Sequence, residues 1–102
     1  MSVKARMDQL IKDYAVFVIS KSTCPFCHTA KKVLGKYDIP AEKMKIIDID
    51  GDKDCSEIQS YMQQITGGRT VPRVFIQGRL ILLFHPVKER SLTELTYSWL
   101  QN

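Results

Sequence analysis

The sequence lacks the features that mark membrane, secreted or modular proteins. Its 102 residues contain no stretch close to the ~20 consecutive apolar residues of a membrane span. The N-terminal segment, Met1 to Asp13, mixes charged and apolar residues instead of presenting a basic cap and an apolar leader. No repeat, low-complexity tract or linker divides the chain. We therefore expect a single domain over residues 1–102, located in the cytoplasm and without a membrane partner.

Cysteine and excess charge are also scarce. There are three cysteines, an odd number, and a chain of this length can bury on the order of 65% of its unfolded surface without disulfides. This excludes an extracellular disulfide framework and favours a reducing compartment. The net charge is only +4, and the lysines alternate with acidic residues, without the interleaved aromatics of a nucleic-acid surface. We expect a monomer that does not bind nucleic acid.

The spacing of apolar residues predicts an alternation of helices and strands. Helical spacing is found in three segments, at residues 7–14, 26–37 and 58–65. Two apolar and β-branched segments, Ala15 to Ile19 and Met44 to Ile49, lie between them and predict strands covered on both faces. Gly67 and Gly68 follow the third segment and are expected to end that helix, because glycine takes the left-handed conformation of a helix C-terminus.

The C-terminal third predicts a hairpin and a last helix. Val74 to Ile76 and Leu80 to Phe84 read as two strands joined by a Gln77-Gly78 turn, and Ser91 to Glu94 form a capping box. The order is α-β-α-β-α-β-β-α. Strands joined through a helix are parallel and a hairpin is antiparallel. The predicted fold is therefore α/β, a mixed four-stranded sheet with helices on both faces.

The main chemical motif is a pair of cysteines, Cys24 and Cys27, placed where the first strand ends and the second helix begins. A thiol at a helix N-terminus is stabilised as thiolate by the helix dipole and by unpaired backbone N–H groups. In C-x-x-C settings the cysteine pKa falls to roughly 3.5–7.5. We expect Cys24 to be the exposed nucleophile and Cys27 the resolving thiol. Pro25 suits the first helical turn because its missing N–H has no helical partner.

Two other interpretations of the cysteines remain open. The pair could be two small apolar side chains packed at a helix start. Alternatively, five residues could be nominated as zinc ligands, although a second well-spaced Cys or His pair is missing. They are Cys24, Cys27, His28, Cys55 and His85. His28 alone is expected to be an ordinary solvent-facing residue, and Cys55 is either incidental or a modifiable thiol.

Basic residues flank the cysteine pair. Lys21 stands three residues before Cys24, where a cation can stabilise a thiolate and hold an anionic substrate. For Lys31, Lys32 and Lys36, on the following helix, we prefer the interpretation of a solvated face.

A second motif, Arg69 to Pro72, stands just before a strand. Proline there forces Val71 into an extended conformation. Pro72 either merely starts the strand or is cis, which would turn the Val71 backbone towards a peptide-like substrate.

Taken together, these residues resemble a dithiol glutaredoxin of the thioredoxin-fold superfamily. The resemblance is carried by Lys21, Cys24-Pro25-Phe26-Cys27, the stretch from Glu57 to Gly67, and Arg69 to Ile76. It extends from about residue 10 to residue 78. It implies a thioredoxin-like fold and a glutathione-dependent thiol–disulfide oxidoreductase that reduces glutathione mixed disulfides and protein disulfides.

The resemblance also implies roles for single residues. Cys24 would attack the disulfide, and Cys27 would be needed only for protein disulfides. Lys21 and Gln59 would hold the glycine carboxylate of glutathione. Its remaining contacts would come from Phe26, Thr70, Val71 and a cis Pro72. Glutathione is the expected co-substrate, glutathionylated or disulfide-containing proteins are the expected partners, and no metal is expected.

One segment departs from the family pattern. Ile81 to Pro86 stand where the family has a Gly-Gly turn followed by an aspartate that binds the γ-glutamyl end of glutathione. Leucine does not readily take the positive φ of glycine, and Pro86 has no N–H. We expect weaker glutathione affinity and a strand that continues through Phe84. Residues 80–102 are either a divergent ending or the product of an altered reading frame.

Other functional classes remain as alternatives. They are an impaired glutaredoxin, a module that uses Cys24 and glutathione to hold an iron–sulfur cluster, and a thioredoxin-type enzyme. The last two are disfavoured by the residues around the first cysteine, Thr23, Pro25 and Phe26.

Overall fold

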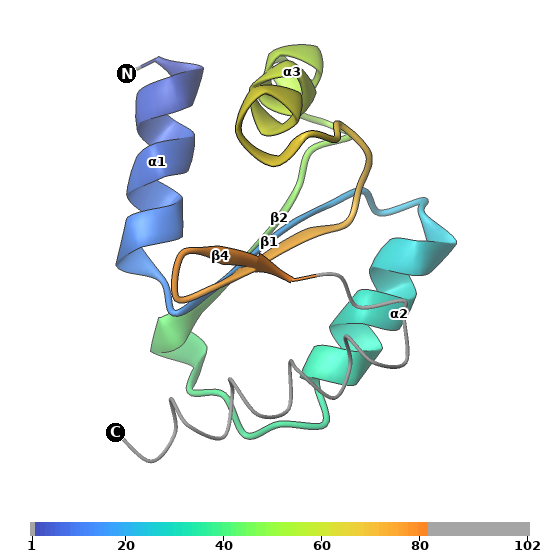
Figure 1. Ribbon diagram of the computed structural model, residues 1–102. Coiled ribbons are helices and arrows are strands. Elements are labelled where there is room, and N and C mark those ends of the chain that lie inside the picture. The colour runs from blue at the N-terminus through green and yellow to red at the C-terminus, as the bar shows by residue number, and fades with distance from the viewer. Residues whose placement is uncertain (1, 82–102) are drawn as a thin grey trace.

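The computed structural model describes residues 2–81, which form a four-stranded mixed sheet flanked by three α-helices (Figure 1). The strands lie in the order β2-β1-β3-β4. The elements are α1 (Val3–Asp13), β1 (Val16–Ser20), α2 (Pro25–Leu34), the 3₁₀ turn η1 (Ala41–Lys43), β2 (Met44–Asp48), α3 (Cys55–Thr66), β3 (Arg73–Ile76) and β4 (Arg79–Ile81). The predicted thioredoxin-like fold is confirmed. The expected last helix from Ser91 and the strand extension to Phe84 lie outside the described residues.

The strand directions bring three loops together at one end of the strands. β1 is parallel to β2, with Ser20 opposite Asp48, as expected for strands joined through a helix. β3 is antiparallel to β1, with Ile19 opposite Arg73, and β4 is antiparallel to β3. The ends of β1 and β2 therefore meet the start of β3. The cysteine pair follows β1 at this end of the strands, and Pro72 precedes β3 at the same end.

The two predicted buried strands differ in their surroundings. All five residues of β1 are buried, as expected. The prediction for β2 is wrong, because Met44, Ile46 and Ile47 are only half-buried and Lys45 is exposed. β2 is an outer strand of the sheet, and on one side it has no neighbouring strand within residues 2–81. Ile49, which is fully buried, follows the strand instead of belonging to it.

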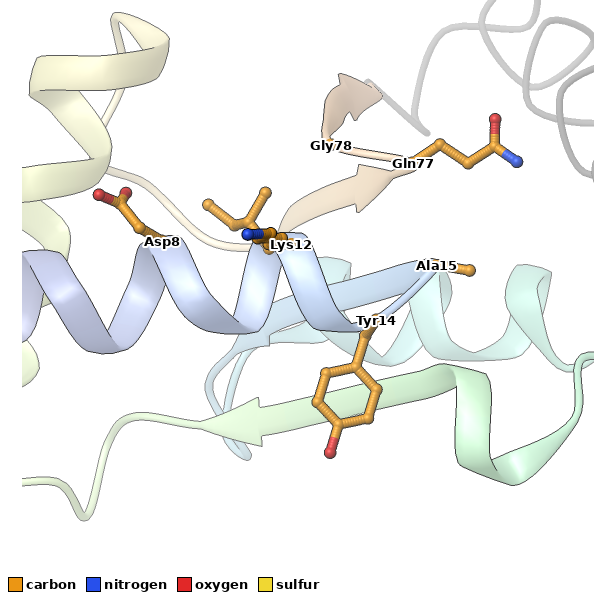
Figure 2. Close-up of a pocket in the computed structure, with 7 residues that line it drawn as sticks. Asp8, Lys12, Tyr14, Ala15, Gln77 and Gly78 are labelled. Carbon is orange, nitrogen blue, oxygen red and sulfur yellow. The ribbon is translucent and has the colours of Figure 1, made fainter.

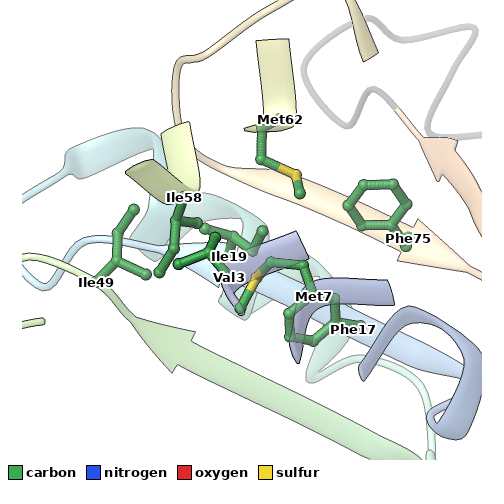
Figure 3. Close-up of a cluster of buried hydrophobic side chains, with 8 residues drawn as sticks. All are labelled: Val3, Met7, Phe17, Ile19, Ile49, Ile58, Met62 and Phe75. Atoms are coloured by element: carbon green, nitrogen blue, oxygen red, sulfur yellow. The ribbon is translucent and has the colours of Figure 1, made fainter. Parts of the chain in front are cut away.

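Hydrophobic side chains pack on both faces of the sheet. On one face α1 and α3 pack against β1 and β3, and Figure 3 shows the Phe17 and Phe75 rings in this cluster with Met7, Ile58 and Met62. The two ring centroids are 6.2 Å apart. The second cluster joins α2 to the opposite face; its buried members are Val16, Val18, Ala30, Val33, Leu34, Val74 and Ile76. These contacts fix α2, and with it the cysteine pair, against the sheet.

Local signals set the element ends. α1 begins at Val3, earlier than the apolar spacing indicates, because the Ser2 hydroxyl accepts a hydrogen bond from the Ala5 N–H at 3.1 Å and caps the helix. α3 ends at Gly67 with φ +83°, which confirms the expected left-handed C-cap. Gln77 and Gly78 both have positive φ in the two-residue turn between β3 and β4, as a tight hairpin requires.

Candidate active site

Cys24 occupies the N-cap position of α2, and Pro25 is the first residue of the helix. The Cys24 backbone is extended, and its carbonyl oxygen accepts hydrogen bonds from the N–H groups of Cys27 and His28 at 3.1 and 3.2 Å. Its side chain is half-buried, whereas Phe26, in the same turn, is 62% exposed. The first thiol therefore stands at the positive end of the helix dipole, with an exposed aromatic ring in the same turn.

The pKa of Cys24 lies below the usual value of a cysteine. Burial acts to raise this pKa, but it is outweighed by hydrogen bonds from the Cys27 side chain and from the N–H groups of Cys27 and Phe26, together with the charge of Lys21. Each of these groups stabilises the thiolate more than the thiol. Cys24 thus has the properties of a nucleophile.

Cys27 is fully buried and behaves oppositely. Burial raises the pKa of its thiol to about 11, with a further contribution from the neighbouring Cys24 thiolate. Its sulfur accepts a hydrogen bond from the Lys21 N–H at 3.4 Å. The two sulfurs therefore differ in the way that an attacking thiolate and a protonated resolving thiol require.

The loop before β3 faces the first thiol. The Val71–Pro72 peptide bond is cis, which decides between the two interpretations of Pro72. The Cys24 thiol donates to the Val71 carbonyl oxygen at a distance of 3.9 Å. Residues 47 positions apart in the sequence are thus in contact. The space above Cys24 is bordered by the backbone of this loop.

Lys21 and Cys24 are the first and last residues of one tight turn. The Cys24 N–H donates to the Lys21 carbonyl oxygen at 3.2 Å, the hydrogen bond that closes a β-turn. The half-buried Lys21 is therefore held in the same turn as the thiol, and its charge contributes to the low pKa of Cys24.

Gln59 has partners within the protein that its sequence position did not indicate. Its Nε2 atom donates to the Arg69 carbonyl oxygen at 3.0 Å, and its Oε1 atom accepts from the Cys55 thiol at 3.6 Å. Thr70, the next residue of the loop, accepts a hydrogen bond from Arg73 at 3.3 Å. Gln59 thus ties α3 to the loop that carries Thr70 and Val71. In the sequence, the four-residue spacing of Cys55 and Gln59 signals only their contact within α3, and no signal predicts the hydrogen bond from Gln59 to Arg69.

One expectation about the second helix needs correction. Lys31 is half-buried and forms an ion pair of 3.0 Å with Asp48, so it does not belong to a solvated face. Lys32 and Lys36 are exposed, as expected. His28 is also exposed, as expected, and in addition its Nε2 atom lies 2.8 Å from the Ser22 carbonyl oxygen in the turn that ends at Cys24. Sequence periodicity predicts neither of these two contacts.

Other parts of the molecule do not join this site. A cavity of about 680 Å³ lies between the end of α1 and the β3–β4 turn, lined by residues that include Tyr14, Ala15, Gln77 and Gly78 (Figure 2). Ala15 precedes β1, whereas the cysteines follow it, so the cavity is at the opposite end of that strand. Between residues 2 and 81, no helix has the length and apolarity needed to span a membrane. In the same range, no three His, Cys, Asp or Glu side chains gather as a metal site would require.

Several known proteins are similar to this chain in sequence and in fold. The Glutaredoxin family model matches residues 16–81. Glutaredoxin-1 of Sus scrofa is 41% identical over 73 residues, which are 72% of this chain and 69% of the relative. The crystal structure of the holo form of glutaredoxin C1 from Populus tremula x tremuloides superposes with a TM-score of 0.81, at 27% identity, covering 94% of this chain and 96% of that one.

A third relative was solved with a ligand. The buckwheat glutaredoxin–glutathione complex has a TM-score of 0.81 and 27% identity, and covers 94% of this chain and 88% of that chain. The family match spans more than half of the sequence and includes both cysteines and the cis-proline loop. The chain therefore belongs to the glutaredoxin family, a family of thiol–disulfide oxidoreductases.

Proposed function

We propose that this protein is a glutathione-dependent oxidoreductase that reduces glutathione mixed disulfides and protein disulfides. The observation that carries the proposal is the difference between the two thiols of one helical turn. The pKa of Cys24 is lowered, chiefly by hydrogen bonds that outweigh burial, whereas burial raises that of Cys27 to about 11. The cysteine content fits a reducing compartment such as the cytoplasm, where the protein would act as a monomer.

The first reaction needs only Cys24. Its thiolate attacks the glutathione sulfur of a protein–glutathione mixed disulfide, so that a bond forms between Cys24 Sγ and that sulfur while the old S–S bond breaks. The protein thiolate leaves and takes a proton from solvent. A second glutathione thiolate then attacks the glutathione sulfur on Cys24, which releases glutathione disulfide and restores the Cys24 thiolate. Over the whole cycle, one free glutathione thiol is consumed, the protein thiol is released, and the glutathione that was bound to the protein leaves as half of the glutathione disulfide.

Reduction of a protein disulfide also needs Cys27. Cys24 attacks the substrate disulfide and forms a mixed disulfide with it. Cys27 then loses its proton to solvent and attacks Cys24 Sγ, which expels the substrate as a dithiol and leaves a Cys24–Cys27 disulfide. Two glutathione molecules reduce that disulfide. The high pKa of Cys27 keeps it protonated until this step.

The residues around the thiols suggest how glutathione would be held. Lys21, beside Cys24, supplies a positive charge for a carboxylate, and the Val71 backbone before cis Pro72 faces the reacting sulfur. Thr70 and Phe26 would border the bound molecule. Gln59 would contribute by holding the Arg69 carbonyl, in addition to any contact with the glycine carboxylate.

A glutathione-coupled reductase assay on three proteins tests the proposal. Wild type, Cys24→Ser and Cys27→Ser are compared on a glutathionylated peptide and on a protein disulfide. We expect Cys24→Ser to lose both activities, and Cys27→Ser to lose only the second. Equal activity of all three proteins would contradict the proposal. The visible absorbance of freshly purified protein tests the alternative of an iron–sulfur module, which predicts a coloured protein.

The affinity for glutathione is a separate part of the proposal. The family match ends at Ile81, where the sequence departs from the expected Gly-Gly and aspartate pattern. We therefore expect a higher Michaelis constant for glutathione than in ordinary family members. A value in their usual range would show that residues 82–86 do not weaken binding.

A further inference from the structure

The turn that carries Lys21 and Cys24 is held from two sides through Ser22. On one side the Ser22 N–H donates to Asp50 Oδ1 at 3.1 Å, and the Ser22 hydroxyl donates to Asp50 Oδ2. On the other side the Ser22 carbonyl oxygen is bound by His28 Nε2 at 2.8 Å. Asp50 comes from the loop after β2 and His28 from α2. The turn is thus fixed between two segments that are 22 positions apart in the sequence.

Lys21 and Cys24, at the two ends of the turn, also form backbone hydrogen bonds. The Lys21 N–H donates to Cys27 Sγ, and the Cys24 N–H donates to the Lys21 carbonyl oxygen. Just before the turn, the Ser20 carbonyl oxygen accepts from the Ile49 N–H at 2.9 Å, which aligns the β2 loop with the end of β1. Asp50, the next residue, is thereby placed at Ser22.

Asp50 also lies within the electrostatic reach of Lys21. Its carboxyl pKa is lowered, first by the two hydrogen bonds from Ser22 and in smaller part by the charge of Lys21. The same lysine charge lowers the pKa of Cys24. One cation therefore interacts electrostatically with both a fixed carboxylate and the reactive thiolate. Other titratable groups near the turn are Cys27, which accepts from the Lys21 N–H, and His28 on α2. Asp48 is also near: it forms an ion pair with Lys31, and the charge of Asp50 acts to raise its pKa.

We propose that Asp50 is a positioning residue of the active site, which fixes the Lys21–Cys24 turn through Ser22 and weakens the attraction of Lys21 for anionic substrates. Two effects follow, and they are separable. The hydrogen bonds keep the turn in the geometry that stabilises the Cys24 thiolate. The negative charge offsets part of the Lys21 field, so that glutathionylated substrates are bound without being held too strongly. The effect of the Asp50 charge rests on the proposed function only where glutathionylated proteins are named as the anionic substrates.

Alkylation of Cys24 by a neutral and an anionic reagent measures the two effects without any enzyme assay. Iodoacetamide carries no charge and iodoacetate carries one negative charge. The ratio of their rates at Cys24 reports the local potential, and the pH at which the iodoacetamide rate is half-maximal reports the thiolate pKa. Both are followed by mass spectrometry of the Cys24 peptide. A failure of the proposed glutathione chemistry would leave these measurements unaffected.

Asp50→Asn keeps the geometry but removes the charge, because the amide oxygen can still accept from the Ser22 N–H and the amide nitrogen can donate to the Ser22 hydroxyl. We expect this variant to raise the iodoacetate-to-iodoacetamide ratio about threefold, which corresponds to one exposed charge pair. Its half-maximal pH should not rise. Asp50→Ala removes both effects, so we expect the higher ratio together with a half-maximal pH above that of wild type.

Ser22→Ala and Asp38→Asn complete the set. Ser22→Ala keeps the Asp50 charge, so its ratio should equal that of wild type. Asp38→Asn removes an exposed carboxylate beyond the far end of α2 and should change neither measurement. An Asp50→Asn ratio no higher than that of Asp38→Asn would overturn the electrostatic part of the proposal. Equal half-maximal pH values for Asp50→Ala and wild type would overturn the positioning part.

Discussion

The sulfur of Cys24 lies 3.9 Å from the carbonyl oxygen of Val71, across the gap between the start of α2 and the loop that ends in cis Pro72. This contact defines one border of the site. The other border is the Lys21–Cys24 turn, closed by a 3.2 Å hydrogen bond. The Val71 backbone and the turn that carries Lys21 therefore both border Cys24.

The reactivities of the two thiols should separate with pH. The thiolate fraction is one half at the pKa of the thiol, so Cys24, with its lowered pKa, should reach half of its maximal alkylation rate below pH 9. Cys27 should reach half of its maximal rate only at about pH 11. We expect iodoacetamide at neutral pH to modify Cys24 and to leave Cys27 unmodified at early times. Peptide mapping checks this, and equal early labelling of both residues would contradict it.

Gln59 should stabilise the loop that faces Cys24. Gln59→Met removes the donor to the Arg69 carbonyl oxygen, so we expect a loss of about 0.5–1.5 kcal/mol in the free energy of unfolding. Gln63→Met, at an exposed position one turn later on α3, is the matched control and should have a much smaller effect. Urea unfolding of both variants provides the measurement. Equal stabilities would show that the Gln59 hydrogen bond does not hold the loop.

The packing of α3 against the sheet depends on Ile58 (Figure 3). Because Ile58 is fully buried, we expect Ile58→Ala to lower the free energy of unfolding by about 2–5 kcal/mol. Ile65, on the same helix, is 44% exposed, and Ile65→Ala should change stability by about 0.5 kcal/mol at most. Denaturant unfolding should separate the two variants clearly. If they lose similar stability, the described packing of α3 is wrong.

The ion pair between Asp48 and Lys31 should make the free energy of unfolding depend on pH in the acidic range. Hydrogen bonds from Ser20 and Lys31 lower the pKa of the Asp48 carboxyl. A carboxyl with a lowered pKa in the folded state contributes stability above its unfolded pKa of 3.8, and this contribution is lost as the pH falls through the folded pKa. We expect Asp48→Asn to be less stable than wild type at neutral pH. The difference in free energy of unfolding between wild type and Asp48→Asn should become smaller at about pH 3 and below.

Unfolding at the two pH values tests this prediction. Asp13→Asn, which removes an exposed carboxylate at the end of α1, is the control. A deficit of Asp48→Asn that stays constant between neutral and acidic pH would mean that the ion pair contributes nothing through its charge.

Much of the catalytic motif could be predicted because it is local. Cys24 and Cys27 are three positions apart, and Pro25 and the preceding strand place them in the first turn of a helix. Helix capping and the helix dipole act within one turn, so sequence neighbours suffice to predict a low pKa at Cys24 and a different environment for Cys27. The order of elements followed from apolar spacing in the same way.

The contacts that complete the site join residues far apart in the chain. Asp50 binds Ser22 across 28 positions, and Val71 meets Cys24 across 47. Periodicity predicts which face of an element is apolar, but not which loops meet at one end of the strands. It also overestimated the burial of β2, which is an outer strand of the described sheet.

The sequence by itself therefore determined the family resemblance, the helix that carries the cysteines and the place of Cys24 at the start of that helix. Only the tertiary structure decided that Pro72 is cis, that Gln59 holds the Arg69 carbonyl, and that Asp50 fixes the turn before Cys24. The reason is physical. A helix cap is formed by neighbours in the chain, whereas a hydrogen bond between two loops depends on strand direction and register.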